Sequence, residues 1–180
     1  MKRMSRWIST AAVLAAVAAV AAAGPAPAYA TGNLVACTLP SSESTTFDPP
    51  MTATPTPTMV TVDRTYSSCV SLSQPAVVSG TYAGSFLRPT QSCVTLLGGG
   101  SRIFTITWNT GQTSTLTGTS NSNIVGAAIV NVTTGTVTSG LFSGASFTQT
   151  VTTPSLAITF CTLGLGTVAS ATGLVELLIV

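Results

Sequence analysis

Apolar residues alternate with threonine or serine along most of residues 31–180, and this pattern constrains the fold more than any other feature. Val60, Val62 and Tyr66 fall on one side of one such segment, and Thr61 falls on the other. A two-residue period sends successive side chains to opposite faces of a β-strand. These residues include 32 threonines and 19 serines, and branching at Cβ makes threonine favour strands. Since no window has the apolar spacing of an amphipathic helix, the sequence predicts an all-β chain.

Glycine and proline punctuate the alternating runs and mark the expected strand boundaries. Strands are predicted near residues 31–38, 60–67, 76–86, 92–97, 102–108, 112–119, 123–132, 136–142, 146–152, 156–160 and 168–179. The proline-rich segment 47–58 predicts a polyproline-like or edge stretch, because proline cannot donate to a ladder. Residues 109–111 and 133–135 each place glycine where a three-residue hairpin loop needs a left-handed residue. The expected fold is an antiparallel β-sandwich or barrel of roughly 8–10 strands.

One phrase occurs twice: VVSGTYAGSF at residues 77–86 returns as VTSGLFSGASF at residues 137–147. Each copy places an aromatic ring between two glycines at alternate positions. Such a ring flanked by bare backbone suits a tightly coiled strand or a ring that covers a neighbouring glycine. The repeat predicts a sandwich or barrel corner that is used twice, with a symmetric pair of ligand sites as the alternative.

Four cysteines, Cys37, Cys69, Cys93 and Cys161, form an even set in a chain with an export signal. Such a set predicts two disulfides, each adding about 2–4 kcal/mol to the free energy of unfolding. Their spacing fits no zinc site, and the chain has no histidine to complete one. Spacing leaves all three possible pairings open.

The first 30 residues have the organisation of a signal peptide. A basic segment with Lys2, Arg3 and Arg6 precedes the apolar run 8–23, and the small residues of Ala-Tyr-Ala at 28–30 predict cleavage after Ala30. The apolar run is shorter than the about 20 residues that span a bilayer. Residues 31–180 are therefore expected to be a single secreted β domain that does not span the membrane. The lipobox-like sequence at 34–37 lies too far from the apolar run to predict lipidation.

Charge is scarce after residue 30, where only seven charged side chains remain. They are Glu43, Asp48, Asp63, Arg64, Arg88, Arg102 and Glu176. Without histidine or a further lysine the segment lacks the usual general bases and metal ligands, so we expect no enzyme, no metal site and no cofactor. The arginines are separated by 24 and 14 residues, which argues against a phosphate-binding patch for nucleic acid. No ligand-binding residue stands out.

The acidic residues each have an expected position. Glu43 and Asp48 are expected in a solvated loop before the proline-rich stretch, while Asp63 and Arg64 are expected on opposite faces of a strand. Glu176 interrupts an apolar run. It faces solvent if its neighbours at 175, 177 and 179 form the core, and is buried with a partner in the opposite register. The solvent-facing register is the prediction.

The stretches RIFTITWNTGQTSTL at 102–116 and TGTVTSGLFSG at 134–144 resemble a group of small secreted β-rich proteins of Streptomyces-type actinobacteria. The resemblance covers most of residues 31–180. It implies a signal peptide, an antiparallel β fold and disulfides. The group has no assigned activity, so the resemblance implies no functional residues.

A hydroxyl-rich surface with few charges predicts a secreted, non-catalytic protein with a structural or surface-binding role. Its expected partner is a cell-surface or matrix component, such as a glycan or the cell wall, or a second copy of the chain. The alternative is a secreted hydrolase inhibitor that presents segment 87–91 or 49–57 to an enzyme cleft.

Overall fold

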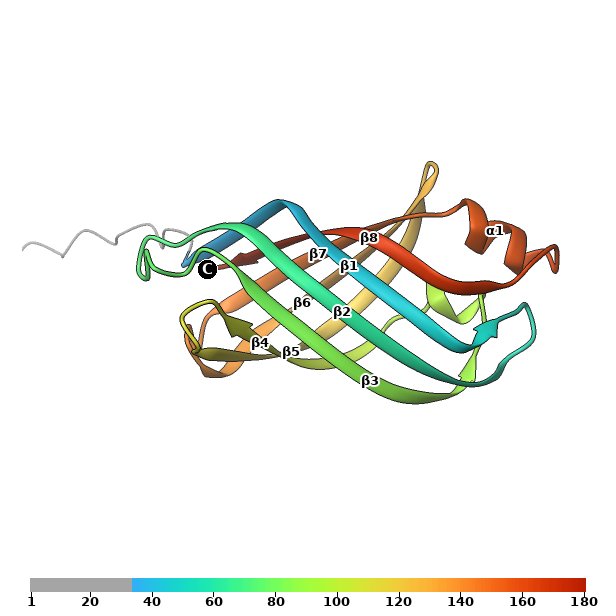
Figure 1. Cartoon of the computed structure of the whole chain (residues 1–180), viewed down its shortest axis with the longest axis horizontal. Helices are drawn as coiled ribbons and strands as arrows, with labels where there is room; N and C mark the ends of the chain where they lie inside the picture. The colour runs from blue at the N-terminus through green and yellow to red at the C-terminus, as the bar shows by residue number, and fades with distance from the viewer. Residues whose placement is uncertain (1–33) are drawn as a thin grey trace, which may run out of the picture. The chain divides into compact units, whose positions relative to one another are not determined.

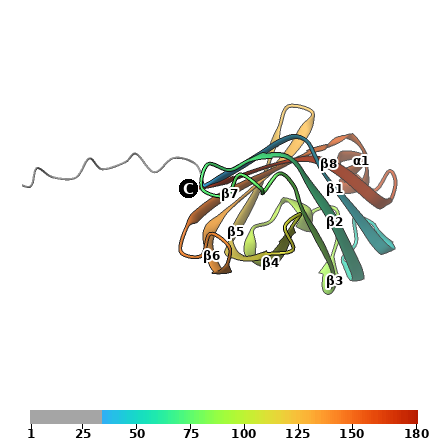
Figure 2. The same cartoon turned by 60° about the vertical axis from the view of Figure 1, so that its left-hand side comes forward.

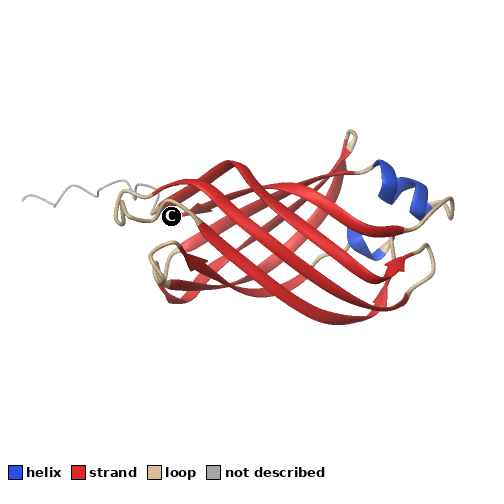
Figure 3. Cartoon of the chain, viewed as in Figure 1, coloured by secondary structure: helices blue, strands red, loops and turns tan. Residues whose placement is uncertain are grey.

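The alternating segments fold into eight antiparallel strands in the computed structural model, which describes residues 34–180 (Figure 1). The signal peptide predicted for residues 1–30 lies outside the described residues. The strands are β1 (Val35–Met51), β2 (Thr56–Val70), β3 (Gly80–Gln91), β4 (Gly100–Trp108), β5 (Thr113–Val125), β6 (Ala128–Gly140), β7 (Ser146–Pro154) and β8 (Val168–Ile179). A 3₁₀ turn η1 (Thr95–Leu97) and a helix α1 (Leu156–Thr162) complete the described part. Figure 3 shows how little of it is helical.

Each strand pairs with the next along the chain, and β8 closes the sheet on β1. The all-β prediction is therefore confirmed, and of its two architectures the chain adopts the barrel rather than the sandwich. Closure gives nearly every strand a partner on both sides, which satisfies its backbone hydrogen-bonding groups.

The pairing of β3 with β4 is the exception. Only Gly80 and Thr81 of β3 are in register with β4, opposite Trp108 and Thr107. Beyond this point the two strands diverge (Figure 2). We call this line of separation the β3–β4 seam.

The inward-facing side chains form two core clusters inside the barrel. The first cluster surrounds Tyr66 and Trp108, which are 0% and 2% exposed, with further apolar side chains from most of the strands. The second cluster includes Phe47, Val60 and Val62, and Ile158 of α1 packs onto it. Threonines such as Thr105, Thr119 and Thr136 point outward, as the two-residue period predicts.

Helix α1 replaces the strand predicted at residues 156–160. The apolar residues at 156, 158 and 160 alternate, but the buried side chains of α1 are Ile158 and Cys161. Positions three apart lie on the same face of a helix, so this segment closes the barrel end with a helical face. The predicted strand at 92–97 is likewise a loop followed by η1.

The proline-rich segment 47–58 is not a separate stretch. Its first residues belong to β1 and its last to β2, with the connection at residues 52–55. The single long strand β1 also contains Glu43 and Asp48, so the predicted loop before the prolines is absent.

Of the two predicted hairpin loops, one is confirmed and one is wrong. At residues 109–111 the chain turns with Gly111 at φ +82°, and the Trp108 amide donates to the Gln112 carbonyl. Residues 133–135 instead lie inside β6, where Gly135 pairs with Gly118 of β5. A Cβ on Gly135 would lie 2.1 Å from the Thr117 carbonyl oxygen, so close strand approach explains this glycine.

The repeated phrase does not mark two equivalent corners. Its first copy lies in β3, with Gly80 packed against the Trp108 ring. Its second copy ends β6 and forms the turn into β7, where Phe142 has φ +64°. The two copies therefore perform different structural tasks.

Both predicted disulfides form, and the pairing that the sequence left open is now fixed. Cys37 of β1 bonds Cys69 of β2, which cross-links neighbouring strands beside the first cluster. Cys93, in the loop before η1, bonds Cys161 of α1, which ties together the two segments at the other barrel end. Because Cys37 is bonded to Cys69, it has no free thiol.

Candidate ligand-binding cavity

A cavity of about 690 Å³ lies inside the barrel and opens partly to solvent. Its lining combines Tyr82 and Phe104 from beside the first cluster with Phe47, Val60 and Ile158 from the second. An eight-stranded barrel is just wide enough either to be filled by side chains or to hold one small ligand. Here the two clusters leave room between them for a ligand.

All three arginines of residues 34–180 line this cavity. Arg64 comes from β2, Arg88 from β3 and Arg102 from β4. The lining contains a single acidic residue, Glu43. The impression from the sequence that the charges are scattered is therefore wrong for the arginines, and the cavity carries an excess of positive charge.

The position of each arginine follows from strand alternation. Arg64 is two residues from Val62 and from Tyr66, Arg88 is two residues from Phe86, and Arg102 is two residues from Phe104. Side chains two apart share a face of a strand. This periodicity was visible in the sequence and is the signal that could have identified the arginines as interior residues.

Arg64 and Glu43 form an ion pair in the cavity wall. The two residues are register partners across β1 and β2, and Nε of Arg64 donates a hydrogen bond to the Glu43 carboxylate. Both side chains are 15% exposed. The prediction that Glu43 is a solvated loop residue is therefore wrong, because β1 runs on through its position.

The arginine of this pair is also held by aromatic rings. Its guanidinium carbon lies 5.2 Å from the Tyr82 ring centroid and 5.3 Å from that of Phe104, within the range of a cation–π contact. Burial lowers the pKa of Arg64, but the Glu43 carboxylate and nearby tyrosines raise it further, leaving it above its ordinary value. Arg64 is thus a charged, neutralised part of the cavity wall.

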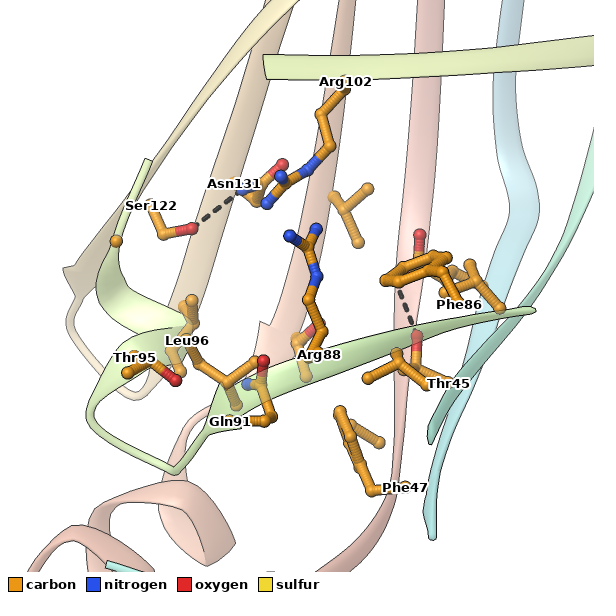
Figure 4. Close-up of a pocket in the computed structure, with 18 of the residues that line it drawn as sticks. Thr45, Phe47, Phe86, Arg88, Gln91, Thr95, Leu96, Arg102, Ser122 and Asn131 are labelled. Atoms are coloured by element: carbon orange, nitrogen blue, oxygen red, sulfur yellow. Dashed lines mark hydrogen bonds between the residues drawn. The ribbon is translucent and has the colours of Figure 1, made fainter. Parts of the chain in front are cut away.

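Arg88 and Arg102 approach from the two sides of the β3–β4 seam. Figure 4 shows their guanidinium groups pointing toward one another inside the cavity. Arg88 lies over the Phe86 ring, 4.8 Å from its centroid, and Nη1 of Arg102 donates to the Ser101 carbonyl at 3.2 Å. Neither forms an ion pair with any residue of the described segment 34–180. Burial and the positive charges of Arg88 and Arg64 lower the pKa of Arg102.

Neutral polar groups face the arginines from β5 and β6. Asn131 donates from Nδ2 to the Ser122 hydroxyl at 2.8 Å, and its Oδ1 accepts from the Thr133 hydroxyl at 3.3 Å. Figure 4 places Asn131 beside Arg102. The half-buried Asn131 therefore offers hydrogen bonds to the cavity interior.

A second polar pair lies deeper in the barrel. The Tyr66 hydroxyl donates to Oε1 of Gln149 at 2.6 Å, and both side chains are buried. Burial raises the pKa of Tyr66 far above its usual value. The phenol therefore remains a neutral hydrogen-bond donor in the core below the cavity.

The remaining acidic residues lie outside the cavity. Asp48, Asp63 and Glu176 are exposed. Val175, Leu177 and Ile179 form the buried face of β8, as the solvent-facing prediction for Glu176 requires. Within residues 34–180, no three side chains of histidine, cysteine, aspartate or glutamate come together as metal ligands.

No protein-family model matches the chain, and neither a curated protein nor a solved structure matches it. The fold and the cavity therefore carry the functional argument. They define an up-and-down β-barrel with an interior cavity that is apolar at one end and rich in arginine at the seam.

Proposed function

We propose that this protein is a secreted, non-catalytic binding protein that carries one small organic molecule inside its barrel. The observation that carries the proposal is the cavity of about 690 Å³. Ligand sites typically measure about 300–1,000 Å³ and combine apolar walls with a few placed polar groups. The lining of this barrel has both features.

The residue inventory supports binding rather than catalysis. The chain contains no histidine, and the one carboxylate of the lining, Glu43, is engaged by Arg64. General acid–base chemistry needs a group that can take up and release a proton near neutral pH. Arginines remain protonated, so they suit binding and charge stabilisation.

Secretion is supported by the covalent structure. The two disulfides are of the kind that persists in oxidising compartments. Among residues 34–180, no helix is long and apolar enough to cross a membrane. We therefore place the site of action outside the cytoplasm, as the predicted signal peptide also implies.

The uncharged probe N-phenyl-1-naphthylamine tests whether the cavity binds ligand. Fluorescence titration of the purified protein should give saturable binding at a stoichiometry of one. Ala171→Phe places a ring in the cavity lining and should abolish this binding. The matched control, Thr172→Phe, adds the same ring at an exposed position and should leave binding unchanged. Absence of saturable binding, or full binding by the Ala171→Phe protein, would contradict the proposal.

The outer surface supports a second proposal, contact with a glycan or cell-wall surface. Threonine hydroxyls are paired along neighbouring strands, with Thr105 and Thr115 at 3.0 Å and Thr117 and Thr138 at 3.4 Å. Few charges interrupt this hydroxyl surface. Co-sedimentation with purified cell-wall polysaccharide tests the proposal, and a protein that stays in the supernatant would argue against it.

The inhibitor alternative has less support from the fold. Residues 87–91 end β3, and 49–57 are divided among β1, a turn and β2, so neither segment forms a long projecting loop. Assay against a panel of proteases and amylases tests this alternative directly.

A further inference from the structure

We infer that the molecule carried in the barrel is an amphipathic organic acid, whose anionic group binds between Arg88 and Arg102 and whose apolar body fills the inner cavity. The inference rests on the proposed binding function and adds the chemical class of the ligand. It predicts a carboxylate, sulfonate or phosphate attached to an apolar body.

The first argument is charge balance. Three arginines line the cavity against one glutamate, and that glutamate is paired with Arg64. Arg88 and Arg102 therefore face the cavity without a carboxylate partner among residues 34–180. Charges that are partly withdrawn from water are stable only when they are paired or well hydrogen-bonded. A bound anion would supply the missing partner.

The second argument is geometry. The two guanidinium groups point toward one another across the β3–β4 seam (Figure 4). Like charges placed together in a half-buried site repel, and the lowered pKa of Arg102 reflects this. A guanidinium group presents a planar set of N–H donors that matches the oxygens of a carboxylate or phosphate. An oxyanion between the arginines would accept hydrogen bonds from both.

The third argument is the apolar remainder of the cavity. Phe47, Val60, Val62, Ile129 and Ile158 line it away from the arginines and belong to the second core cluster. A small inorganic anion would neutralise the arginines but leave this surface without contacts. An organic acid with an apolar body satisfies both parts of the site. Its charged end would lie at the seam, close to solvent.

Two fluorescent probes that differ only in a sulfonate group provide the test. N-phenyl-1-naphthylamine is uncharged, and 8-anilinonaphthalene-1-sulfonate adds one negative charge to the same ring system. Charge-assisted hydrogen bonds to two arginines should make the sulfonate bind at least about tenfold more tightly at low salt. The double variant Arg88→Gln/Arg102→Gln should reduce sulfonate binding to the level of the uncharged probe, whose own affinity should not change.

A matched control separates local binding from a change of net charge. Thr105→Glu lowers the net charge by one unit on the exposed face of β4 and should leave both affinities unchanged. Should the arginine double variant fail to fold, competition on the unmodified protein decides. Decanoate should displace the uncharged probe at least about tenfold better than decanol of the same chain length.

The outcomes separate this inference from the binding function itself. Equal affinity for both probes, or for decanoate and decanol, would overturn the inference and leave the binding function intact. Failure of either probe to bind would overturn the binding function. Displacement of the sulfonate probe by inorganic sulfate as effectively as by decanoate would show that the site recognises the anion alone, which would also overturn the inference.

Discussion

Glu43 and Arg64 face one another across the first two strands of the barrel and form an ion pair in the cavity wall. Their inward direction follows from alternation, because Glu43 shares a strand face with Phe47 and Arg64 shares one with Val62. The strand pairing then brings the two charges together. The pair removes one cation from the charge balance of the cavity and leaves Arg88 and Arg102 available for a ligand.

Breaking this pair should destabilise the protein. Glu43→Gln leaves the Arg64 charge largely buried without its carboxylate, and we expect the free energy of unfolding to fall by about 3 kcal/mol. Urea denaturation followed by circular dichroism measures the change. Replacing both residues, as in Glu43→Gln/Arg64→Met, should recover much of the loss, because no charge then remains unpaired.

Glu176→Gln provides the control for that measurement. Glu176 is exposed on β8, so its replacement should change stability by less than about 0.5 kcal/mol. Equal effects at Glu43 and Glu176 would show that the ion pair does not contribute to stability.

Close approach of β5 and β6 predicts a second stability effect. In Gly135→Ala the added methyl would lie 2.1 Å from the Thr117 carbonyl oxygen and 2.5 Å from Gly118 Cα. Since both neighbours are backbone atoms, the ladder must shift, and we expect a loss of about 3 kcal/mol. Gly166→Ala, where nothing lies within 4 Å of the added methyl, should be neutral by comparison. Thermal melting of the two variants distinguishes these expectations.

The hydrogen bonds of Ser114 predict a third effect. Its hydroxyl accepts from the Trp108 indole nitrogen at 2.8 Å and donates to the Leu141 carbonyl at 2.6 Å. Ser114→Ala leaves a buried indole N–H without an acceptor, which should cost about 1–3 kcal/mol. The exposed Ser139→Ala should cost little. An unchanged unfolding midpoint for Ser114→Ala would contradict the predicted role.

The two disulfides should differ in their effect on ligand binding. Replacing Cys93 and Cys161 by serine frees the loop before η1 from α1 at the cavity end, so affinity for the uncharged probe should fall. Replacing Cys37 and Cys69 removes a link between strands that are already hydrogen-bonded. Each pair should lower the free energy of unfolding by about 2–4 kcal/mol. Equal losses of affinity in the two double variants, measured under conditions where both remain folded, would contradict the predicted difference.

Ionisation of Tyr66 should couple stability to high pH. Its pKa in the folded state is raised above the unfolded value of about 10, so folding favours the neutral phenol. The resulting stability is fully present below pH about 10 and is lost as pH rises through the folded pKa. Absorbance at 295 nm should show that Tyr66 ionises only as the protein unfolds. A Tyr66→Phe difference spectrum with an ordinary tyrosine titration would contradict this.

Alternation along the strands made much of the fold predictable. It identified the all-β class, the outward position of Glu176 and the hairpin at 109–111. The same rule failed at 156–160, because alternating apolar residues fit either a strand or a short helix that uses a different pair of side chains. At 133–135 the glycine serves strand packing, which a local turn pattern does not distinguish.

The cavity was harder to predict because it depends on the spatial order of strands. Each arginine shares an alternating run with aromatic or apolar residues, so its inward direction was readable. Their convergence was not, since it requires β2, β3 and β4 to be neighbours with a particular register. Arg64, for example, meets Tyr82 through the β2–β3 register. Such pairings join residues far apart in sequence.

The β3–β4 seam has a further consequence for how the protein avoids joining with copies of itself. Strand segments that are not paired with a neighbour expose a ladder edge to which another chain can add. Along this edge β3 carries Arg88 and Pro89, and β4 carries Arg102. Proline and inward-pointing charges are features that prevent pairing at such edges. The residues proposed to hold the ligand therefore also protect the open side of the barrel from edge-to-edge aggregation.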